Sequence, residues 1–286
     1  MHFGGHGTAC LATDGKIIWK TQLPHALVYC PSSTPVLYKD LLIVPCHGSG
    51  ARYLAALDKQ TGAVRWKQEH PAGPSDSTPL VIHTAAGDQL ICNLAHRVVA
   101  YDPRTGEEIW STKQSGYANV PRPVYGNGLV FVCGGYMVPG VLAIRTDGRG
   151  DVTKTHVAWS LLREAIPQNP SPLLIGDELY LISDNGHASC LDARTGKLHW
   201  REGVAGASAG TDTTGKSVGY YASPVFADGR IYFFNNKGET TVIAAGATFK
   251  KLASNKLEGA TLASPAAAGK EIYVRTDRHL YRIEKQ

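Results

Sequence analysis

The sequence lacks any apolar run of the length that a membrane-spanning helix needs, about 18 residues or more. Its first residues, MHFGGHGTAC, also lack the basic segment and apolar stretch of a signal peptide. The net charge of +5 is spread along the chain, and the densest basic group is Arg275, Arg278, Arg282 and Lys285. Nucleic-acid binding favours a concentrated basic stripe, so no nucleic-acid partner is predicted. We interpret this group as a solvated edge, with an acidic partner such as an anionic glycan as the alternative.

Cysteine is sparse, and no two cysteines are adjacent or form a CxxC motif. Their spacing gives no disulfide framework, and the histidines share no ligand spacing with them, so no zinc site is predicted. Most of them fall in or beside expected strands, where a small buried side chain is the simplest interpretation. We therefore expect mostly free, buried thiols. The six are Cys10, Cys30, Cys46, Cys92, Cys133 and Cys190.

Common catalytic motifs are also missing. No GxSxG elbow is present, and the Gly-rich stretch HGSGARY (residues 47–53) is followed by an expected strand and not by a helix that would hold a phosphate. Residues 147–151 (DGRGD) have the charge of a calcium loop but lack the bidentate Glu at the twelfth position. We expect an ordinary loop with Asx turns there, and no metal site.

The chain does contain a repeated phrase that ends in tryptophan, and no tryptophan lies outside it. Clear copies are LAALDKQTGAVRW (residues 54–66), VVAYDPRTGEEIW (98–110) and ASCLDARTGKLHW (188–200). Degenerate copies end at Trp19 and Trp159, and Leu252 holds the same place in a further copy. Successive tryptophans are 41 to 49 residues apart. A strand-like repeat with this period indicates a repeat architecture.

Each copy predicts two strands joined by a turn. An alternating apolar run leads to Asp, then Thr-Gly, then a short strand that ends in Trp. Asp accepts hydrogen bonds from the backbone that follows it, and Gly adopts positive φ without steric cost. We expect the Trp to close the contact with the neighbouring unit. Two more strands precede each copy, and the first opens at a Ser-Pro or Thr-Pro such as Ser171-Pro172.

Four short strands per unit, repeated radially, predict an all-β fold with the blades of a β-propeller. Residues 1–286 read as one such domain. Five blades are expected to be whole, and they begin near residues 31, 74, 120, 167 and 220. The segment after residue 263 supplies three strands, and the segment before residue 20 supplies two strands and the tail of another (residues 2–4).

The combination AxDxxTGxxxW resembles the pyrroloquinoline-quinone (PQQ) type propeller repeat, over nearly the whole chain. That family includes quinoprotein alcohol dehydrogenases and the propeller lipoprotein of outer-membrane protein assembly. YDPRTGEEIW, DGRGDVTKTHVAW and RTDRHLYRIE are most similar to the planctomycete-style PQQ-repeat propellers. The resemblance implies export to the periplasm or cell surface. It also implies further residues upstream and a ring of eight blades, so we expect an N-terminally truncated chain; a six- or seven-bladed ring with an overlapped seam is the alternative.

The resemblance also raises the question of catalysis. Quinoprotein dehydrogenases of this family hold PQQ between a tryptophan and two adjacent, disulfide-linked cysteines, with Ca²⁺ nearby. This sequence has no adjacent cysteines, and its five tryptophans are all used by the repeat. We therefore predict no cofactor and a non-catalytic protein, with a PQQ- and Ca²⁺-dependent oxidoreductase as the alternative.

A binding platform remains. In a propeller, the loops between blades and the turns between second and third strands meet at one mouth of the central channel, which is a common place for ligands. The residues that this mapping places there are His25, Tyr29, His47, Asp76, Tyr117, Asn119, Arg122, Gln168, Asn169, Asp184, Asn185, His187, Tyr220, Asn235, Asn236, Lys237, Asp277 and Arg278.

This set is polar, aromatic and mixed in charge, which suits a protein or peptide partner. We expect a monomeric scaffold module of the cell envelope. A carbohydrate-binding propeller is a second alternative, suggested by Tyr29, Tyr117 and Tyr220. The loop of residues 205–219 exceeds the usual loop length, which indicates function or disorder.

Overall fold

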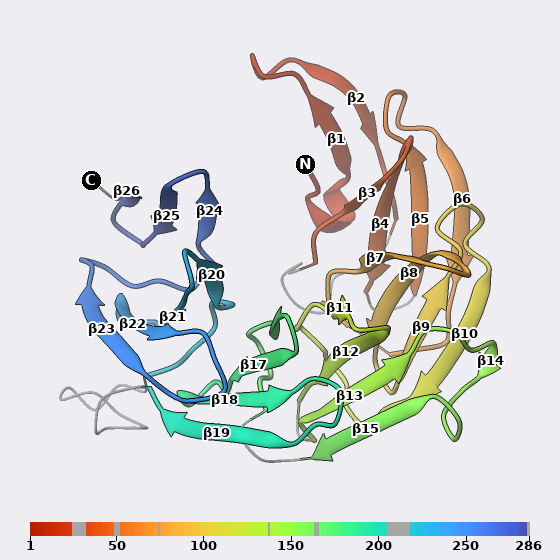
Figure 1. The fold of residues 1–286 in the computed structure, drawn as a ribbon. Helices are drawn as coiled ribbons and strands as arrows, with labels where there is room; N and C mark the ends of the chain where they lie inside the picture. The colour runs from red at the N-terminus through yellow and green to blue at the C-terminus, as the bar shows by residue number, and fades with distance from the viewer. Residues whose placement is uncertain are drawn as a thin grey trace.

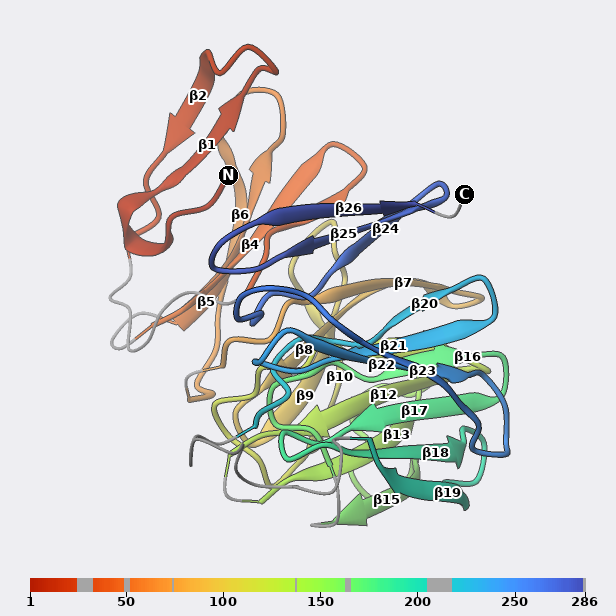
Figure 2. The same ribbon diagram turned by 90° about the vertical axis from the view of Figure 1, so that its left-hand side faces the viewer.

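The computed structural model describes residues 1–24, 33–48, 52–73, 75–136, 138–162, 166–204 and 218–284. Within these ranges the chain forms antiparallel sheets, and its single helical element is the 3-10 turn Gly4–His6. The sheets follow one another along an arc, each with its first strand on the inner side (Figure 1). The arc stays open between the two sheets nearest the chain ends, which also lie apart in the perpendicular view (Figure 2).

Five sheets contain four antiparallel strands in sequence order, and one of the five gains an extra strand. The first sheet contains β3 (Val36–Tyr38), β4 (Leu41–His47), β5 (Arg52–Asp58) and β6 (Val64–Glu69). The second contains β7 (Leu80–Thr84), β8 (Gly87–Leu94), β9 (Arg97–Tyr101) and β10 (Glu108–Lys113), with β14 (Gly150–Asp151) added at its edge. The third contains β11 (Val124–Gly126), β12 (Leu129–Gly134), β13 (Gly140–Arg145) and β15 (Val157–Leu162).

The fourth sheet contains β16 (Leu173–Ile175), β17 (Glu178–Ile182), β18 (His187–Asp192) and β19 (Leu198–Gly203). The fifth contains β20 (Val225–Ala227), β21 (Arg230–Phe234), β22 (Glu239–Ala244) and β23 (Lys251–Lys256). Two smaller sheets flank them: the hairpin β1 (Thr8–Leu11) and β2 (Ile17–Thr21), and the three strands β24 (Ala266–Ala268), β25 (Glu271–Arg275) and β26 (Leu280–Glu284). The five whole units and two partial ones confirm the predicted blade pattern, while the expected tail at residues 2–4 is reduced to one bridge between His2 and Thr8.

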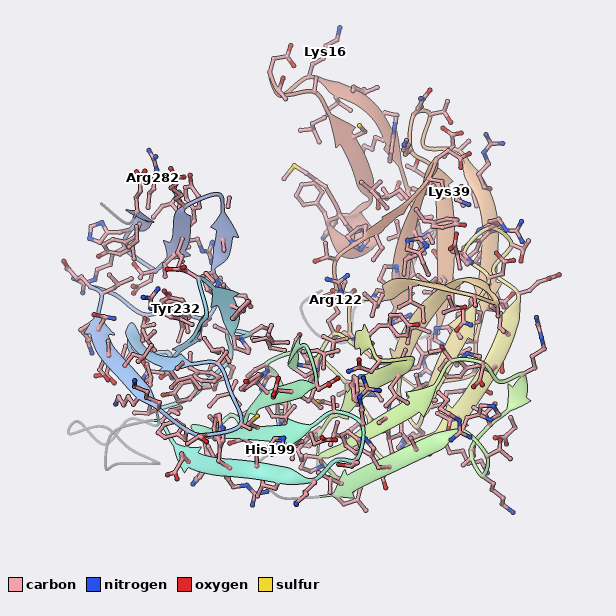
Figure 3. The ribbon with its side chains drawn as sticks, in the orientation of Figure 1. Lys16, Lys39, Arg122, His199, Tyr232 and Arg282 are labelled. Carbon is pink, nitrogen blue, oxygen red and sulfur yellow. The ribbon has the colours of Figure 1, made fainter. Side chains whose placement is uncertain are left out.

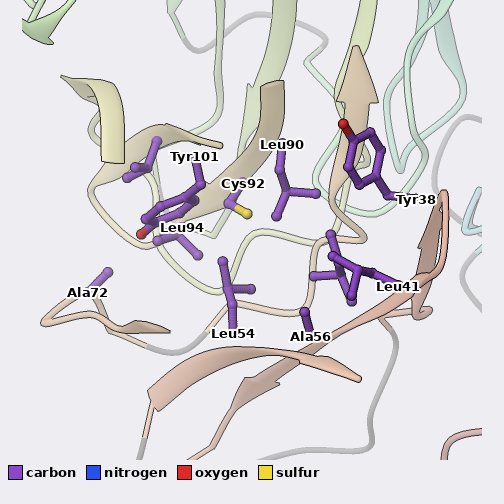
Figure 4. Packing of buried hydrophobic residues seen from close by; sticks show 11 residues of the cluster. Tyr38, Leu41, Leu54, Ala56, Ala72, Leu90, Cys92, Leu94 and Tyr101 are labelled. Carbon is purple, nitrogen blue, oxygen red and sulfur yellow. The ribbon is translucent and has the colours of Figure 1, made fainter. Parts of the chain in front are cut away.

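The hydrophobic core lies between adjacent sheets. Between the first and second sheets, Leu54 and Ala56 face Leu90, Cys92 and their neighbours, and these side chains are almost fully buried (Figure 4). Equivalent clusters fill the next three interfaces. Each of the five four-stranded units therefore buries both faces against its neighbours, which explains the apolar runs of its middle strands.

The tryptophans close these interfaces, as the repeat predicts. The Nε1–H of Trp19 donates to the carbonyl of Lys59, and those of Trp66, Trp159 and Trp200 donate to carbonyls of the next sheet's turn region at 3.0–3.2 Å. The ring also covers the Thr-Gly glycine of that turn: a Cβ built on Gly106 would lie 2.8 Å from Cε3 of Trp66. These glycines also have positive φ, so the turn needs Gly for its backbone conformation and for the close approach of the indole.

The turn itself is held by its aspartate. Oδ1 of Asp58 accepts the backbone N–H groups of Gln60 and Thr61 at 3.0 and 2.9 Å, and Asp192 accepts two equivalent bonds. Asp58 also bonds the backbone N–H of Gly62 through its carbonyl, at 2.8 Å. The predicted Asx turn is confirmed, and it presents a fixed surface on which the neighbouring tryptophan packs.

The residue before the proline has a second role that the sequence did not reveal. The hydroxyl of Thr78 accepts the backbone N–H of Thr34, its counterpart in the preceding sheet, at 2.9 Å. The hydroxyls of Ser171, Ser223 and Ser264 accept the equivalent bond, also at 2.9 Å. The donors are the backbone N–H groups of Arg122, Ser171 and Ser223, which hold the same position in the preceding sheet. The strands begin immediately after these Ser-Pro and Thr-Pro pairs. The small hydroxyl residues thus link the inner strands around the channel.

One unit departs from the pattern. Instead of ending in a plain turn, the DGRGD segment sends β14 back to pair in parallel with β10, with Trp110 opposite Gly150. Trp110 donates to Oε1 of Gln89 at 3.0 Å, and the amide of Gln89 donates to the carbonyl of Thr146 at 2.8 Å. The expected Asx turn is present at Asp151, whose Oδ1 accepts the N–H of Thr153 at 2.9 Å. The added strand was not predicted.

The cysteines follow the prediction where they are described. Cys10, Cys46, Cys92, Cys133 and Cys190 are free thiols, and all but Cys10 are buried. Burial raises the pKa of Cys46 and of Cys190 to about 12, which keeps these thiols protonated and unreactive at neutral pH. Cys30 lies outside the described residues.

The contact between tryptophan and glycine can be tested by a matched pair of alanine substitutions. Gly106→Ala adds a methyl group against Trp66 at a φ of +78°, whereas Gly128→Ala adds one at a φ of +73° with no atom within 4 Å. Positive φ costs an L-residue about 1–2 kcal/mol, and overpacking adds about 1–3 kcal/mol. Urea denaturation should therefore show a clearly larger loss of unfolding free energy for Gly106→Ala. Equal losses would mean that the indole contact does not constrain the turn.

Candidate functional site

The structure brings the inter-sheet loops and the turns between second and third strands together at one end of the sheets. Oδ1 of Asp184, in the turn β17–β18, accepts the backbone N–H groups of Gln168 and Asn169 at 3.0 and 3.2 Å. The turns of the next two sheets hold the preceding loops in the same way. Oδ1 of Asn236 accepts the N–H of Gly219 at 3.0 Å, and Oδ1 of Asp277 accepts the N–H of Ala260 at 2.7 Å. We call this end the loop end.

Three of the residues that the sequence places at the mouth are buried. Asn119 is fully buried and bonds the carbonyl of Leu94 and the N–H of Gly135. Asn235 accepts the N–H groups of Lys237 and Glu239, both at 3.0 Å. Tyr220 is 2% exposed and belongs to the core of the fourth and fifth sheets. Asn119, Asn235 and Tyr220 therefore support the loops from beneath and do not form their surface.

In the loop that leads to the fifth sheet, the residue after the buried Tyr220 is exposed. Tyr221 is 46% exposed, and its counterpart Leu262 in the following loop is 61% exposed. Val120 and Asn169 hold the same place, three residues before the proline, and line a pocket at the loop end. Sequence reasoning missed Tyr221, Leu262 and Val120, although their shared distance from the proline was a usable signal.

A buried histidine that the sequence did not single out directly follows β6 of the first sheet. His70 is 7% exposed and lies edge-on to His47, with ring centroids 5.0 Å apart, while Nδ1 of His47 contacts the carbonyl oxygen of Ser75 at 2.9 Å. Burial, and then the charges of Arg97 and Arg52, lower the pKa of His70 to about 4. Burial likewise raises the pKa of the nearby Asp76 carboxyl. His47 and Asp76 are thus part of a partly buried polar group at the loop end.

The charged and amide members are spread over several sheets. Arg122 stands where the other inter-sheet loops have Ser or Thr, and it lies on the inner side of the arc (Figure 3). Arg278 is exposed and pairs with Glu258 at 2.8 Å. Oδ1 of Asn185 accepts the hydroxyl of Ser183 at 2.5 Å and contacts Nδ1 of His187 at 3.1 Å. Lys237 is half-buried. His25 and Tyr29, and most of the loop of residues 205–219, lie outside the described residues.

The loop end contains one pocket with aromatic and amide walls, between the third and fourth sheets. It has a volume of about 360 Å³ and is lined by Ala118, Val120, Tyr136, Gln168 and Asn169. Tyr136 is 57% exposed and meets Tyr117 edge-on, with centroids 5.8 Å apart. The ring centroid of Tyr117 lies in turn 5.9 Å from that of His96. Tyr136 and His96 were not predicted, although both lie in turns between second and third strands, the class of turn from which other mouth residues were chosen.

A larger pocket of about 510 Å³ lies at the opposite end, among the turns of the second, third and fourth sheets. Its arginines are already engaged: Arg194 pairs with Asp177 at 3.1 Å, and Arg145 donates to the carbonyl of Thr155. One arginine of this pocket is therefore paired with a carboxylate, and the other is held by the backbone.

The described residues do not fit the PQQ site of the quinoprotein dehydrogenases. All five indoles face the neighbouring sheet's turn region or Gln89, so none is placed to cover a quinone in the channel. In the described part of the chain, no three His, Cys, Asp or Glu side chains are grouped to hold a metal ion. Across the same ranges, no helix has the length and hydropathy to cross a membrane.

Comparison with known proteins agrees with this geometry. The profile of the family described as outer membrane protein assembly factor BamB matches residues 4–155 and, in an overlapping match, residues 53–286. BamB from Moraxella catarrhalis is 16% identical, with a TM-score of 0.57 over 93% of this chain and 87% of that one. No curated protein matches the sequence significantly.

Two other solved structures share the fold at low identity. The quinohemoprotein alcohol dehydrogenase from Comamonas testosteroni is 12% identical, with a TM-score of 0.54 over 79% of this chain and only 42% of that one. The computationally designed Ika8 protein is 10% identical, with a TM-score of 0.64 over 95% and 74% of the two chains. These similarities confirm the predicted PQQ-like propeller fold; the number of blades in a closed ring stays a prediction.

The burial of His70 predicts a stability that depends on pH. The unfolded chain protonates this histidine near pH 6.5 and the folded chain only near pH 4, so the unfolded state binds more protons between these values. The unfolding free energy should fall as the pH drops through this window, by about 3 kcal/mol in all from this group. His70→Phe should flatten that slope in urea titrations from pH 4 to 7. The exposed His199 gives the matched control His199→Phe; if both variants keep the wild-type slope, His70 does not cause it.

Proposed function

This chain belongs to the family described as outer membrane protein assembly factor BamB, and we propose that it is a non-catalytic, exported scaffold that binds a protein partner at its loop end. The family match supports a role in protein assembly at the cell envelope, in the periplasm or at the cell surface. The partner is a protein or peptide segment, and the module acts as a monomer.

Tyr221 and Leu262 form an exposed apolar pair, and this pair is the main support for the proposed role. Their loops are joined by the bond from the N–H of Ser223 to the hydroxyl of Ser264, at 2.9 Å, so the two side chains lie on neighbouring sheets of the same end. Each is about half exposed or more, at 46% and 61%. Leaving such side chains in water is unfavourable, and tyrosine is one of the residues that provide much of the binding energy in protein interfaces.

Polar residues occupy the turns that hold the two loops, as the bonds of Asn236 with Gly219 and of Asp277 with Ala260 show. Arg278 and Glu258 form an exposed ion pair at 2.8 Å, and Asn236 and Lys237 belong to the adjacent turn of the fifth sheet. An apolar centre within a charged, hydrated rim is the usual composition of a transient protein interface. The rim charges guide association and make it sensitive to salt.

The oxidoreductase alternative has weaker support. A quinohemoprotein alcohol dehydrogenase shares the fold, but this chain spans less than half of its length. The indoles that would have to cover a quinone are used between sheets, and no three His, Cys, Asp or Glu side chains are grouped among the described residues. We therefore favour the scaffold role.

Site-specific photo-crosslinking tests the scaffold role directly. A photoreactive amino acid at Tyr221 or Leu262 should crosslink one defined protein in the cells that naturally produce this chain, because both side chains face the partner. Ala86, in the turn β7–β8 at the opposite end, is the matched control and should give none of that product. Equal labelling from all three positions, or none from the loop end, would refute the assignment.

The alternative hypothesis, a PQQ-dependent oxidoreductase, is tested by a thermal melt with excess PQQ and Ca²⁺. A ligand that binds only the folded state adds about 2.7 kcal/mol at a hundredfold excess over its dissociation constant. We expect no change in the melting temperature, since the tryptophans that would cover the quinone are engaged elsewhere. A clear rise would overturn the non-catalytic reading and make the quinoprotein alternative the one to pursue.

A further inference from the structure

We propose that the pocket between the third and fourth sheets at the loop end binds a neutral saccharide. It is lined by Ala118, Val120, Tyr136, Gln168 and Asn169. These residues are distinct from Tyr221 and Leu262, so the proposal does not rest on the protein-binding role.

The apolar wall of the pocket is an aromatic ring held in a fixed position. Tyr136 is 57% exposed, which leaves much of its ring accessible. Tyr117 meets it edge-on at an interplanar angle of 82°, and the backbone N–H of Tyr136 donates to the carbonyl of Tyr117 at 3.0 Å. The C–H face of a pyranose packs on an exposed ring of this kind, while its hydroxyls remain available for hydrogen bonds.

The opposite wall carries two amides. Oδ1 of Asp184 accepts the backbone N–H groups of Gln168 and Asn169, and its Oδ2 accepts Nδ2 of Asn169 at 2.6 Å. The Asn169 amide is therefore oriented with its oxygen directed away from that bond. In the described chain no hydrogen bond uses the side-chain amide of Gln168, which leaves both a donor and an acceptor for a ligand. Paired donors and acceptors match the vicinal hydroxyls of a sugar.

The charge and the backbone of the pocket decide between ligand classes. None of the lining residues that the structure describes carries a charge at neutral pH, which favours an uncharged ligand over an ionic one. The N–H groups of Tyr136, Gln168 and Asn169 are all used within the protein, so an extended peptide cannot pair with them as an added strand. The groups that can contact a ligand are therefore the Tyr136 ring and the side-chain amides of Gln168 and Asn169, and this combination favours a sugar. The volume of about 360 Å³ is sufficient for one or two sugar rings.

Local backbone strain supports a functional role for this corner. Ala118 has a φ of 49°, a left-handed conformation that is unfavourable for a residue with a Cβ, and His96 in the adjoining turn has a φ of 61°. Such strain persists where surrounding bonds fix it, and it concentrates at binding sites. Here the strained residue separates Tyr117, which braces the aromatic wall, from the buried Asn119.

Sugar binding should be measured with the full chain. A glycan array and calorimetric titrations with cellotetraose, xylotetraose, mannotetraose and chitotetraose supply the probes. We expect at least one neutral oligosaccharide to bind, and Tyr136→Ala to weaken it about tenfold or more because the stacking face is lost. Gln168→Ala should weaken the same ligand, and Tyr136→Phe should retain most of the affinity because the ring remains.

Tyr221→Ala is the matched control, since it removes an exposed loop-end tyrosine outside the pocket. It should keep sugar affinity while reducing crosslinking to the protein partner, so failure of the two proposals can be told apart. Thermal melts check that each variant is folded. The saccharide proposal is overturned if no glycan binds, if Tyr136→Ala binds like the wild type, or if only an extended-peptide array shows binding that depends on Tyr136.

Discussion

The contact on which the rest of the structure depends is the packing of a tryptophan on the Asp-Thr-Gly turn of the next sheet. Each part has a physical requirement: the aspartate holds the turn through backbone N–H groups, and the glycine permits positive φ and close approach. The indole then donates its N–H to a carbonyl of the same turn region, as Trp66 does to Pro103 at 3.2 Å. Because the contact joins one sheet to the next, its repetition sets the sheets side by side along an arc.

A second set of contacts acts on the inner side. The Ser and Thr residues before the prolines bond from sheet to sheet, as Ser171 does to Ser223 at 2.9 Å. The outer and inner contacts together hold neighbouring sheets to each other at two distances from the centre of the arc. The inner series is interrupted at Arg122, which stands in the place of a hydroxyl residue and has no side-chain oxygen to accept the backbone N–H of Thr78.

Both proposed functions use the loop end, where two surfaces differ in chemistry. Tyr221 and Leu262 offer apolar side chains within a charged rim, which suits a protein. The pocket beside Tyr136 offers a ring and amides without charge, which suits a sugar. An envelope scaffold that holds a protein near a glycan would use both, and the two surfaces lie on different sheets and do not compete for the same residues.

The sequence by itself determined the strand order, the Asx turns, the tryptophan contacts and the free thiols, because each is fixed by residues that are close in the chain or that recur with the repeat. It also placed Gln168, Asn169 and Asp184 together at the loop end. Only the tertiary structure decided which of two adjacent loop residues is exposed, since Tyr220 is buried and Tyr221 is not. The same holds for the added strand β14 and for the meeting of Tyr117 with Tyr136. In these cases the outcome is set by hydrogen bonds and packing between segments distant in sequence, and by the left-handed backbone of Ala118, which no local pattern encodes.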